Sequence, residues 1–202
     1  MIGACPLCGK RPPLFAGLTD CARCAILAGD SRPAPVLDQE EAHQEEDTRP
    51  VILFLVACSA KKGASPAPAR DLYQGPEYRA ARRYVEAHQE EAHPGTRVDW
   101  MILSALHHAI EPDATIAPYD ARIPQATGDH YRWGQHAAGT IRLKYGRRLS
   151  RVVILAPAAY ADGVRPHLEA IGADVEEPLR GLGQGYRLGW FKSRRATTNP
   201  NP

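Results

Sequence analysis

Four cysteines in two pairs carry the clearest chemical signal in this sequence. Cys5 and Cys8 form one C-x-x-C pair, Cys21 and Cys24 form a second, and twelve residues separate the two. Each pair can turn two thiolates toward one tetrahedral ion, and four sulfur ligands leave no position open for water or a substrate. The spacing therefore predicts a zinc ribbon over residues 1–30, in which zinc has a structural role only.

Two disulfides are the alternative interpretation of the same cysteines. They would need an oxidising compartment, and the residues after Met1 do not begin a basic-then-apolar secretory signal. We therefore favour zinc and expect a soluble, cytoplasmic protein. Lys10, Arg11 and Arg23 make the ribbon mildly positive. This suits binding to nucleic acid, binding to a protein partner or a purely structural role.

Length and composition limit the possible classes of protein. The chain has 202 residues, of which 44% are hydrophobic, and this suits one medium domain plus a small appendage. No apolar run approaches the roughly 20 residues of a membrane helix, so we expect no membrane association. The formal net charge is +2, and zinc bound by four thiolates would bring it near neutral. Affinity for nucleic acid would then need a local basic patch.

The pattern along the chain predicts four segments: the ribbon, an acidic and proline-rich linker over 31–49, a folded domain over 50–192 and a disordered tail over 193–202. Within the domain, apolar runs predict strands at 51–57, 98–103 and 151–156, with a short edge strand at 174–176. Helices are expected at 76–91, 129–145 and 161–171, and a last one opens at 181–185 and runs to about 192. This alternation predicts an α/β, Rossmann-like, three-layer fold with a parallel sheet of about four to five strands.

Reactive side chains follow the strands of this predicted sheet. The residues after the first, second and third strands include Cys58, Ser59, Lys61, Lys62, Ser104, His107 and Tyr160. The opposite strand ends offer only ordinary turn residues. Because ligands of open parallel sheets bind beyond the carboxyl ends of the strands, we expect a ligand site there.

Three of these residues are candidates for catalysis. Cys58 could be a nucleophile activated by the nearby lysines, or a small inert core residue. Lys62 and Lys61 could bind a phosphate or form an adduct with an electrophilic carbon, or be simply solvated. His107 could act as a general acid or base.

The loops add candidates for ligand binding. Arg70, Asp71 and Tyr73 lie in the first loop, and Tyr119 and Asp120 lie in the long second loop from 105 to 128. The tyrosines could stack on a base or anchor their loops. A glycine-rich segment at the start of the last predicted helix could bind a phosphate through its backbone N–H groups. The residues are Gly181, Gly183, Gly185 and Arg187.

An ordered set of motifs resembles an uncharacterised domain family of bacteria and phages that is similar to YaaA-like proteins. The motifs are Ala57-Cys-Ser-Ala-Lys-Lys62, Ala69-Arg-Asp-Leu-Tyr73, Trp100-Met-Ile-Leu-Ser-Ala105 with His107, Pro118-Tyr-Asp120 and Gly181-Leu-Gly-Gln-Gly-Tyr-Arg-Leu-Gly-Trp190. Ser104-Ala-Leu-His-His-Ala109 stands where that family usually has Ser-Ala-Lys-His-Gly. The spacing of Cys58 and Lys62 is also faintly similar to the core domain of archaeosine synthase, which adds an amine to a nitrile of a deazaguanine base in RNA. The Pro-Tyr and Ser/His continuation of that motif is absent here.

These observations support three hypotheses of function. The first is an enzyme that acts on a nucleobase or nucleotide, plausibly modifying a base in DNA or RNA, with the ribbon gripping the polynucleotide. The second is a non-catalytic zinc-ribbon module that binds nucleic acid or a protein partner. The third is a hydrolase or transferase of free nucleosides or nucleotides, with a purely structural ribbon.

Overall fold

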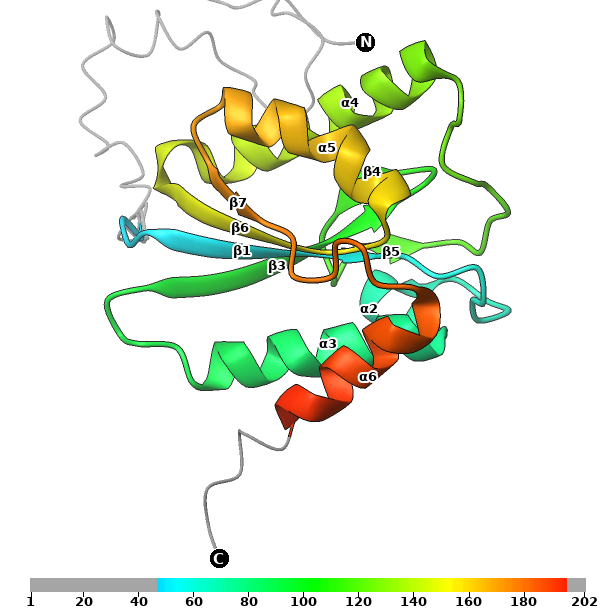
Figure 1. The fold of residues 1–202 in the computed structure, drawn as a ribbon, viewed down its shortest axis with the longest axis horizontal. Helices are drawn as coiled ribbons and strands as arrows, with labels where there is room; N and C mark the ends of the chain where they lie inside the picture. Colours follow the sequence, from blue (N-terminus) through cyan, green and yellow to red (C-terminus); the bar gives the residue numbers. More distant parts are fainter. Residues whose placement is uncertain (1–46, 196–202) are drawn as a thin grey trace, which may run out of the picture. The chain divides into compact units, whose positions relative to one another are not determined.

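The computed structural model describes residues 47–195 (Figure 1). The predicted zinc ribbon with its four cysteines, nearly all of the predicted linker and most of the predicted tail lie outside the described residues. In the described part of the chain, no helix has both the length and the apolar character that a membrane span requires.

The centre of the fold is a five-stranded sheet in the order β4-β3-β1-β6-β7. The predicted strands are confirmed as β1 (Val51–Ala57), β3 (Arg97–Ser104), β6 (Leu149–Leu155) and β7 (Asp174–Glu176), and β7 does lie at an edge. These four strands pair in parallel. The expectation of a wholly parallel sheet is wrong at the other edge, because β4 (His108–Ile110) folds back and pairs antiparallel to β3.

The turn between β3 and β4 explains why the sequence concealed this strand. Three residues, 105–107, connect the strands, and His108 then adopts a left-handed backbone with φ of 62°. Glycine would signal such a turn, and histidine does not, although it tolerates this region better than most residues. His108 stands at the position where the resembled family has glycine.

Helices cover both faces of the sheet, so the fold has three layers (Figure 1). α3 (Pro76–Glu90) and α6 (Gln184–Arg195) lie on one face, and α4 (Thr127–Tyr145) and α5 (Ala158–Ala170) lie on the other. Successive residues of β1 alternate between two cores, since Leu53 and Leu55 belong to the α4–α5 side while Phe54 and Val56 belong to the α3–α6 side. This double burial is the reason for the uninterrupted apolar run at 51–57.

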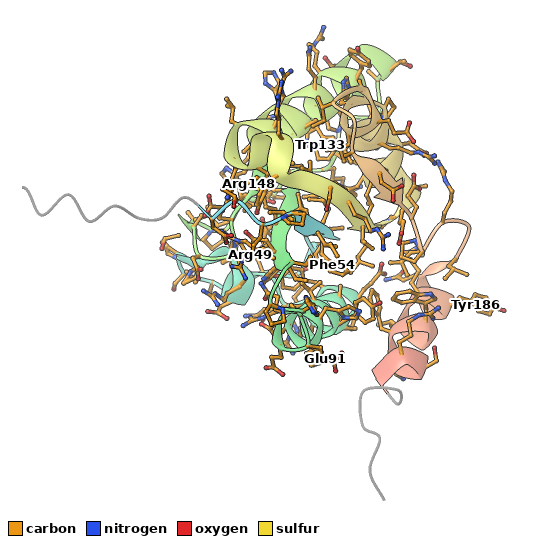
Figure 2. The ribbon with its side chains drawn as sticks, turned by 90° about the vertical axis from the view of Figure 1, so that its left-hand side faces the viewer. Arg49, Phe54, Glu91, Trp133, Arg148 and Tyr186 are labelled. Atoms are coloured by element: carbon orange, nitrogen blue, oxygen red, sulfur yellow. The ribbon has the colours of Figure 1, made fainter. Side chains whose placement is uncertain are left out.

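Short elements complete the fold. α2 (Ala69–Leu72) and a two-stranded sheet of β2 (Ala67–Pro68) and β5 (Thr115–Ile116) lie within the predicted loops, and η1 (Gly146–Arg148) precedes β6. Elements of two to four residues are too short to show a hydrophobic period, so no pattern in the sequence indicates them. At the amino ends of β1 and β6, Arg49 pairs with the carboxylate of Asp47. Arg148 donates to the Asp47 carbonyl at 2.6 Å (Figure 2).

Candidate functional site

The carboxyl ends of β1, β3 and β6 bring several of the predicted site residues together. Cys58 directly follows β1, and its N–H donates to the carbonyl of Leu103 in β3 at 2.9 Å. Its side chain is half-buried and carries a free thiol. Tyr160 lies in the first turn of α5, which follows β6, and its Oη is 3.3 Å from the Cys58 Sγ.

A hydrogen-bonded network of hydroxyl groups lies beside the thiol. The Tyr119 Oη is 2.8 Å from the Tyr73 Oη and 2.7 Å from the Ser104 Oγ. The N–H of His107 donates to the same Ser104 Oγ at 2.9 Å, and the His107 ring meets the Tyr119 ring edge-on at 5.2 Å between centroids. Ser104 is fully buried, so this network fixes the orientation of the Tyr119 hydroxyl.

Lys62 is placed over this network. Its Nζ lies 4.1 Å from the centroid of the Tyr119 ring and 5.8 Å from that of Tyr73. A backbone bridge pairs Lys62 with Tyr73, and the N–H of Gln74 donates to the Lys61 carbonyl at 2.9 Å. The loop after β1 is therefore held against the segment that enters α3, and the ammonium of Lys62 is directed at the aromatic rings.

Ser59 holds the same loop in place. Its Oγ donates to the Lys61 carbonyl at 2.7 Å and accepts the N–H of Gly75 at 3.0 Å. A Cβ at position 75 would come within 2.6 Å of the Ser59 Cβ, so glycine is required at that close approach. These contacts indicate a positioning role for Ser59, where the sequence had indicated ligand binding.

The tyrosines of the site keep their protons. Burial first, and then the neighbouring Cys58, raise the pKa of both Tyr119 and Tyr160 far above the usual value of 10.0. Burial likewise raises the pKa of Tyr73. All three side chains are thus neutral hydroxyl donors near pH 7, and Tyr160 can donate to the sulfur when the thiol ionises. Tyr73 is only 1% exposed, so its ring is covered and unable to stack on a ligand.

Ion pairs divide the positive charges near this edge into two groups. Arg70 pairs with Asp113, and Arg187 pairs with Glu77 at 2.6 Å. Asp71 pairs with Arg82 at 2.8 Å. Within residues 47–195, Lys61 and Lys62 form no ion pair, so the loop after β1 keeps its positive charge.

The glycine-rich turn stands apart from the thiol. Gly181 has a φ of +77°, and α6 begins at Gln184, which places Gly185 inside the helix and leaves Gly181 and Gly183 in the turn. Arg187 donates to the Leu182 carbonyl at 2.8 Å as well as to Glu77, so its guanidinium braces the turn. Among the described residues, no hydrogen bond or ring contact joins this turn to Cys58 or Tyr119. Asp120 lies exposed next to Tyr119.

Trp133 is a site residue that the sequence analysis missed. Its indole Nε1–H donates to the carbonyl of Ser104 at 3.0 Å, and its ring meets that of Tyr160 edge-on at 5.5 Å between centroids. Trp133 lies in α4, a segment for which the sequence predicted a helix but no functional residue. No local pattern distinguishes Trp133 from an ordinary core tryptophan. Over residues 47–195, no cluster of three or more His, Cys, Asp or Glu side chains is suited to hold a metal ion.

Comparison with protein families places this chain in a family without an assigned reaction. The family model, described as a family of unknown function (DUF6884), matches residues 53–193, and the chain belongs to that family. The matched range covers β1 to α6 and all the residues of the site described above. Neither the curated proteins nor the solved structures contain a match.

Proposed function

We propose that this member of the DUF6884 family is an enzyme that acts on a nucleobase or nucleotide, with Cys58 as its nucleophile. The observation that carries the proposal is the 3.3 Å contact between the Cys58 Sγ and the Tyr160 Oη, at the strand ends where Lys62 and Tyr119 also lie. A half-buried thiol in contact with a neutral hydroxyl donor suits covalent catalysis better than a purely structural role.

In this mechanism the Cys58 thiolate adds to an electron-poor carbon of the base. The sulfur–carbon bond forms as a π bond of the ring opens, and the displaced electron pair takes a proton on the adjacent ring nitrogen. Lys62 is the group we assign to this proton, and His107 is the alternative. The Tyr160 hydroxyl stabilises the sulfur anion before addition and after its release. Each of these residues lies at the same strand ends, which is the geometric condition for such a step.

The charges at the mouth of the site support an anionic substrate. Lys61 remains without an acidic partner in the described part of the chain, whereas Arg70 and Arg187 are neutralised by Asp113 and Glu77. A phosphate of the substrate is therefore assigned to Lys61, and not to the glycine-rich turn around Gly183. In this proposal the ribbon binds one zinc through its four cysteines and helps to hold the polynucleotide.

The test compares the intact chain with Cys58→Ala and Lys62→Ala. Each protein is incubated with RNA and DNA from its host, the nucleic acids are digested, and the nucleosides are analysed by mass spectrometry. A new or altered nucleoside should appear with the intact chain and be lost in both variants, while circular dichroism shows all three folded. Arg142→Ala, at an exposed arginine of α4 on the other face of the sheet, is the control and should retain activity.

Intact-protein mass spectrometry tests the covalent step separately. A trapped adduct should localise to the peptide that contains Cys58. If both variants kept full activity on the identified substrate, the mechanism would be wrong. If every form bound nucleic acid in a salt-dependent manner without turnover, the non-catalytic alternative would replace it.

A further inference from the structure

A hollow of about 400 Å³ lies between α3 and α6, away from the Cys58 site. A volume of this size is in the range of small-ligand sites. The Tyr84 and His88 rings form part of its wall and lie 4.2 Å apart between centroids. Ala87 and four charged side chains complete the lining. The charged residues are Arg83, Glu86, Glu90 and Arg194.

The two helices lead from the candidate site to this hollow. Arg187 near the start of α6 pairs with Glu77 near the start of α3, and farther along Trp190 meets Tyr84 at 5.2 Å between ring centroids. α3 and α6 therefore run side by side in the same direction (Figure 1). Both begin at the carboxyl edge of the sheet, where Cys58 lies, and both end at the hollow.

α6 presents an aromatic and basic line along this path. Tyr186, Trp190 and Arg194 are spaced four residues apart, so they follow one another on successive turns of the helix over about 12 Å. Tyr186 is 79% exposed and projects into solvent (Figure 2). The Arg194 guanidinium lies over the Trp190 ring at 4.0 Å from its centroid, which holds the cation in a defined place.

α3 adds positive charge on the other side. Arg79 and Arg83 are exposed one turn apart, and neither forms an ion pair with any acid in residues 47–195. This range contains 21 Lys and Arg against 16 Asp and Glu, a net charge of +5. Thirteen of the sixteen acids are already paired with basic side chains. Two of the three remaining acids, Glu90 and Glu91, stand at the end of α3, so the unpaired positive charge of this helix lies in its first two turns, at Arg79 and Arg83.

We infer that the α3–α6 surface binds single-stranded nucleic acid and leads it toward the Cys58 site. One base stacks on Tyr186, a second enters the hollow beside Tyr84 and His88, and phosphates contact Arg79 and Arg83. The carboxylate of Glu90, which has no basic partner in the described part of the chain, accepts a hydrogen bond from a base amino group. Unpaired bases are required because a duplex hides their faces from aromatic side chains. The inference rests on the proposed function, since it identifies the substrate as a polynucleotide strand.

Binding is measured by fluorescence anisotropy with the full chain and a labelled oligonucleotide, as a single strand and as the matching duplex, between about 50 and 200 mM salt. Tyr186→Ala should weaken binding of the single strand by about 5- to 150-fold, the loss expected for one stacked base. Leu143→Ala is the matched control, because Leu143 is 90% exposed on α4, on the other face of the sheet. It should leave the affinity unchanged.

Charge reversal provides the second arm. Arg83→Glu should lower the slope of log affinity against log salt concentration by about 0.7, the value for one phosphate contact on a single strand. Arg142→Glu on α4 is the control with the same change of charge, and its slope should stay near that of the original chain.

The inference is overturned if the α4 controls lose as much affinity as the α3–α6 variants, if the duplex binds more tightly than the single strand, or if neither binds at low salt. Cys58→Ala separates this result from the proposed chemistry, because it should abolish turnover and leave binding intact. Retained binding without turnover in the original chain would contradict the proposed enzyme and leave the α3–α6 surface standing.

Discussion

The Tyr160 hydroxyl lies 3.3 Å from the Cys58 sulfur, and this contact joins two segments that are 102 residues apart in the sequence. Cys58 directly follows the central strand, while Tyr160 stands in the first turn of α5 and donates its N–H to the Pro157 carbonyl at 2.9 Å. The first turn of α5 therefore places a side-chain donor against the sulfur.

Tyr160→Phe should slow the reaction of Cys58 with iodoacetamide by about three- to tenfold, because one hydrogen bond worth about 1 kcal/mol to the sulfur anion is lost. Peptide mass spectrometry of the alkylated Cys58 provides the rate. Since the pKa of Tyr160 is raised, its hydroxyl donates throughout neutral and mildly alkaline pH, and the difference should persist there. Tyr131→Phe, at an exposed tyrosine of α4, should react like the original chain. Equal rates for Tyr160→Phe and the original chain would remove Tyr160 from the mechanism.

The contact between α4 and α5 depends on Gly134. A Cβ at this position would lie 1.7 Å from the carbonyl oxygen of Gly163 in α5, and backbone cannot yield as a flexible side chain would. Gly134→Ala should therefore lower the free energy of unfolding by about 1–3 kcal/mol. Urea denaturation measures the change. Displacement of α5 should also separate Tyr160 from Cys58 and slow alkylation.

Gly139 provides the matched control on the same helix. A Cβ there meets nothing within 4 Å, so Gly139→Ala should raise the free energy of unfolding by up to about 1 kcal/mol through helix propensity alone. Opposite signs for the two substitutions would establish that packing against α5, and not flexibility of α4, explains the glycine at 134. The same sign for both would contradict the close packing.

His108 should make the stability of the fold depend on pH. Burial first, and then the neighbouring His136 and His107, lower the pKa of His108 below its usual value of 6.5. The unfolded chain then takes up a proton at a higher pH than the folded chain. The contribution of His108 to the free energy of unfolding should thus decline as pH falls through about 6.5 and level off below the folded pKa.

Urea denaturation from pH 8 to pH 5 tests this dependence. His108→Asn, which keeps a residue that tolerates the left-handed backbone, should remove the His108 component. His136→Gln should weaken it by removing one neighbouring charge, since the two rings lie 5.1 Å apart. A pH profile that neither substitution changes would show that His108 does not titrate in this range.

The four N-terminal cysteines should bind one zinc ion per chain. Elemental analysis of the full chain should give a ratio of one, and the double substitution Cys5→Ser and Cys8→Ser should abolish it, because two thiolates cannot hold a tetrahedral structural site. Cys58→Ser is the control and should keep the metal. Zinc that persisted without Cys5 and Cys8, or a disulfide found in their place by mass spectrometry, would refute the zinc ribbon.

Local pattern predicted the main elements of the fold and the position of Cys58 at the end of a strand. The apolar run 51–57 indicated a strand buried on both faces, and Cys58 follows such a strand by one residue, so its place at a carboxyl edge could be foreseen. The short elements could not be foreseen. β4 depends on the backbone of His108, and β2 pairs with β5 from nearly fifty residues away.

The sequence by itself determined which segments become the long strands and helices, because that depends on the hydrophobic period of neighbouring residues. Only the tertiary structure decided which side chains are in contact, because these contacts depend on how segments far apart in the sequence pack together. It placed Trp133 on Ser104 and engaged Arg187 with Glu77, 110 residues away. Lys62 and Tyr119 were both candidate site residues on sequence alone, but their contact could not be predicted. Their contact exists only because the loop after β1 pairs with the segment before α3 and so directs the ammonium onto the ring.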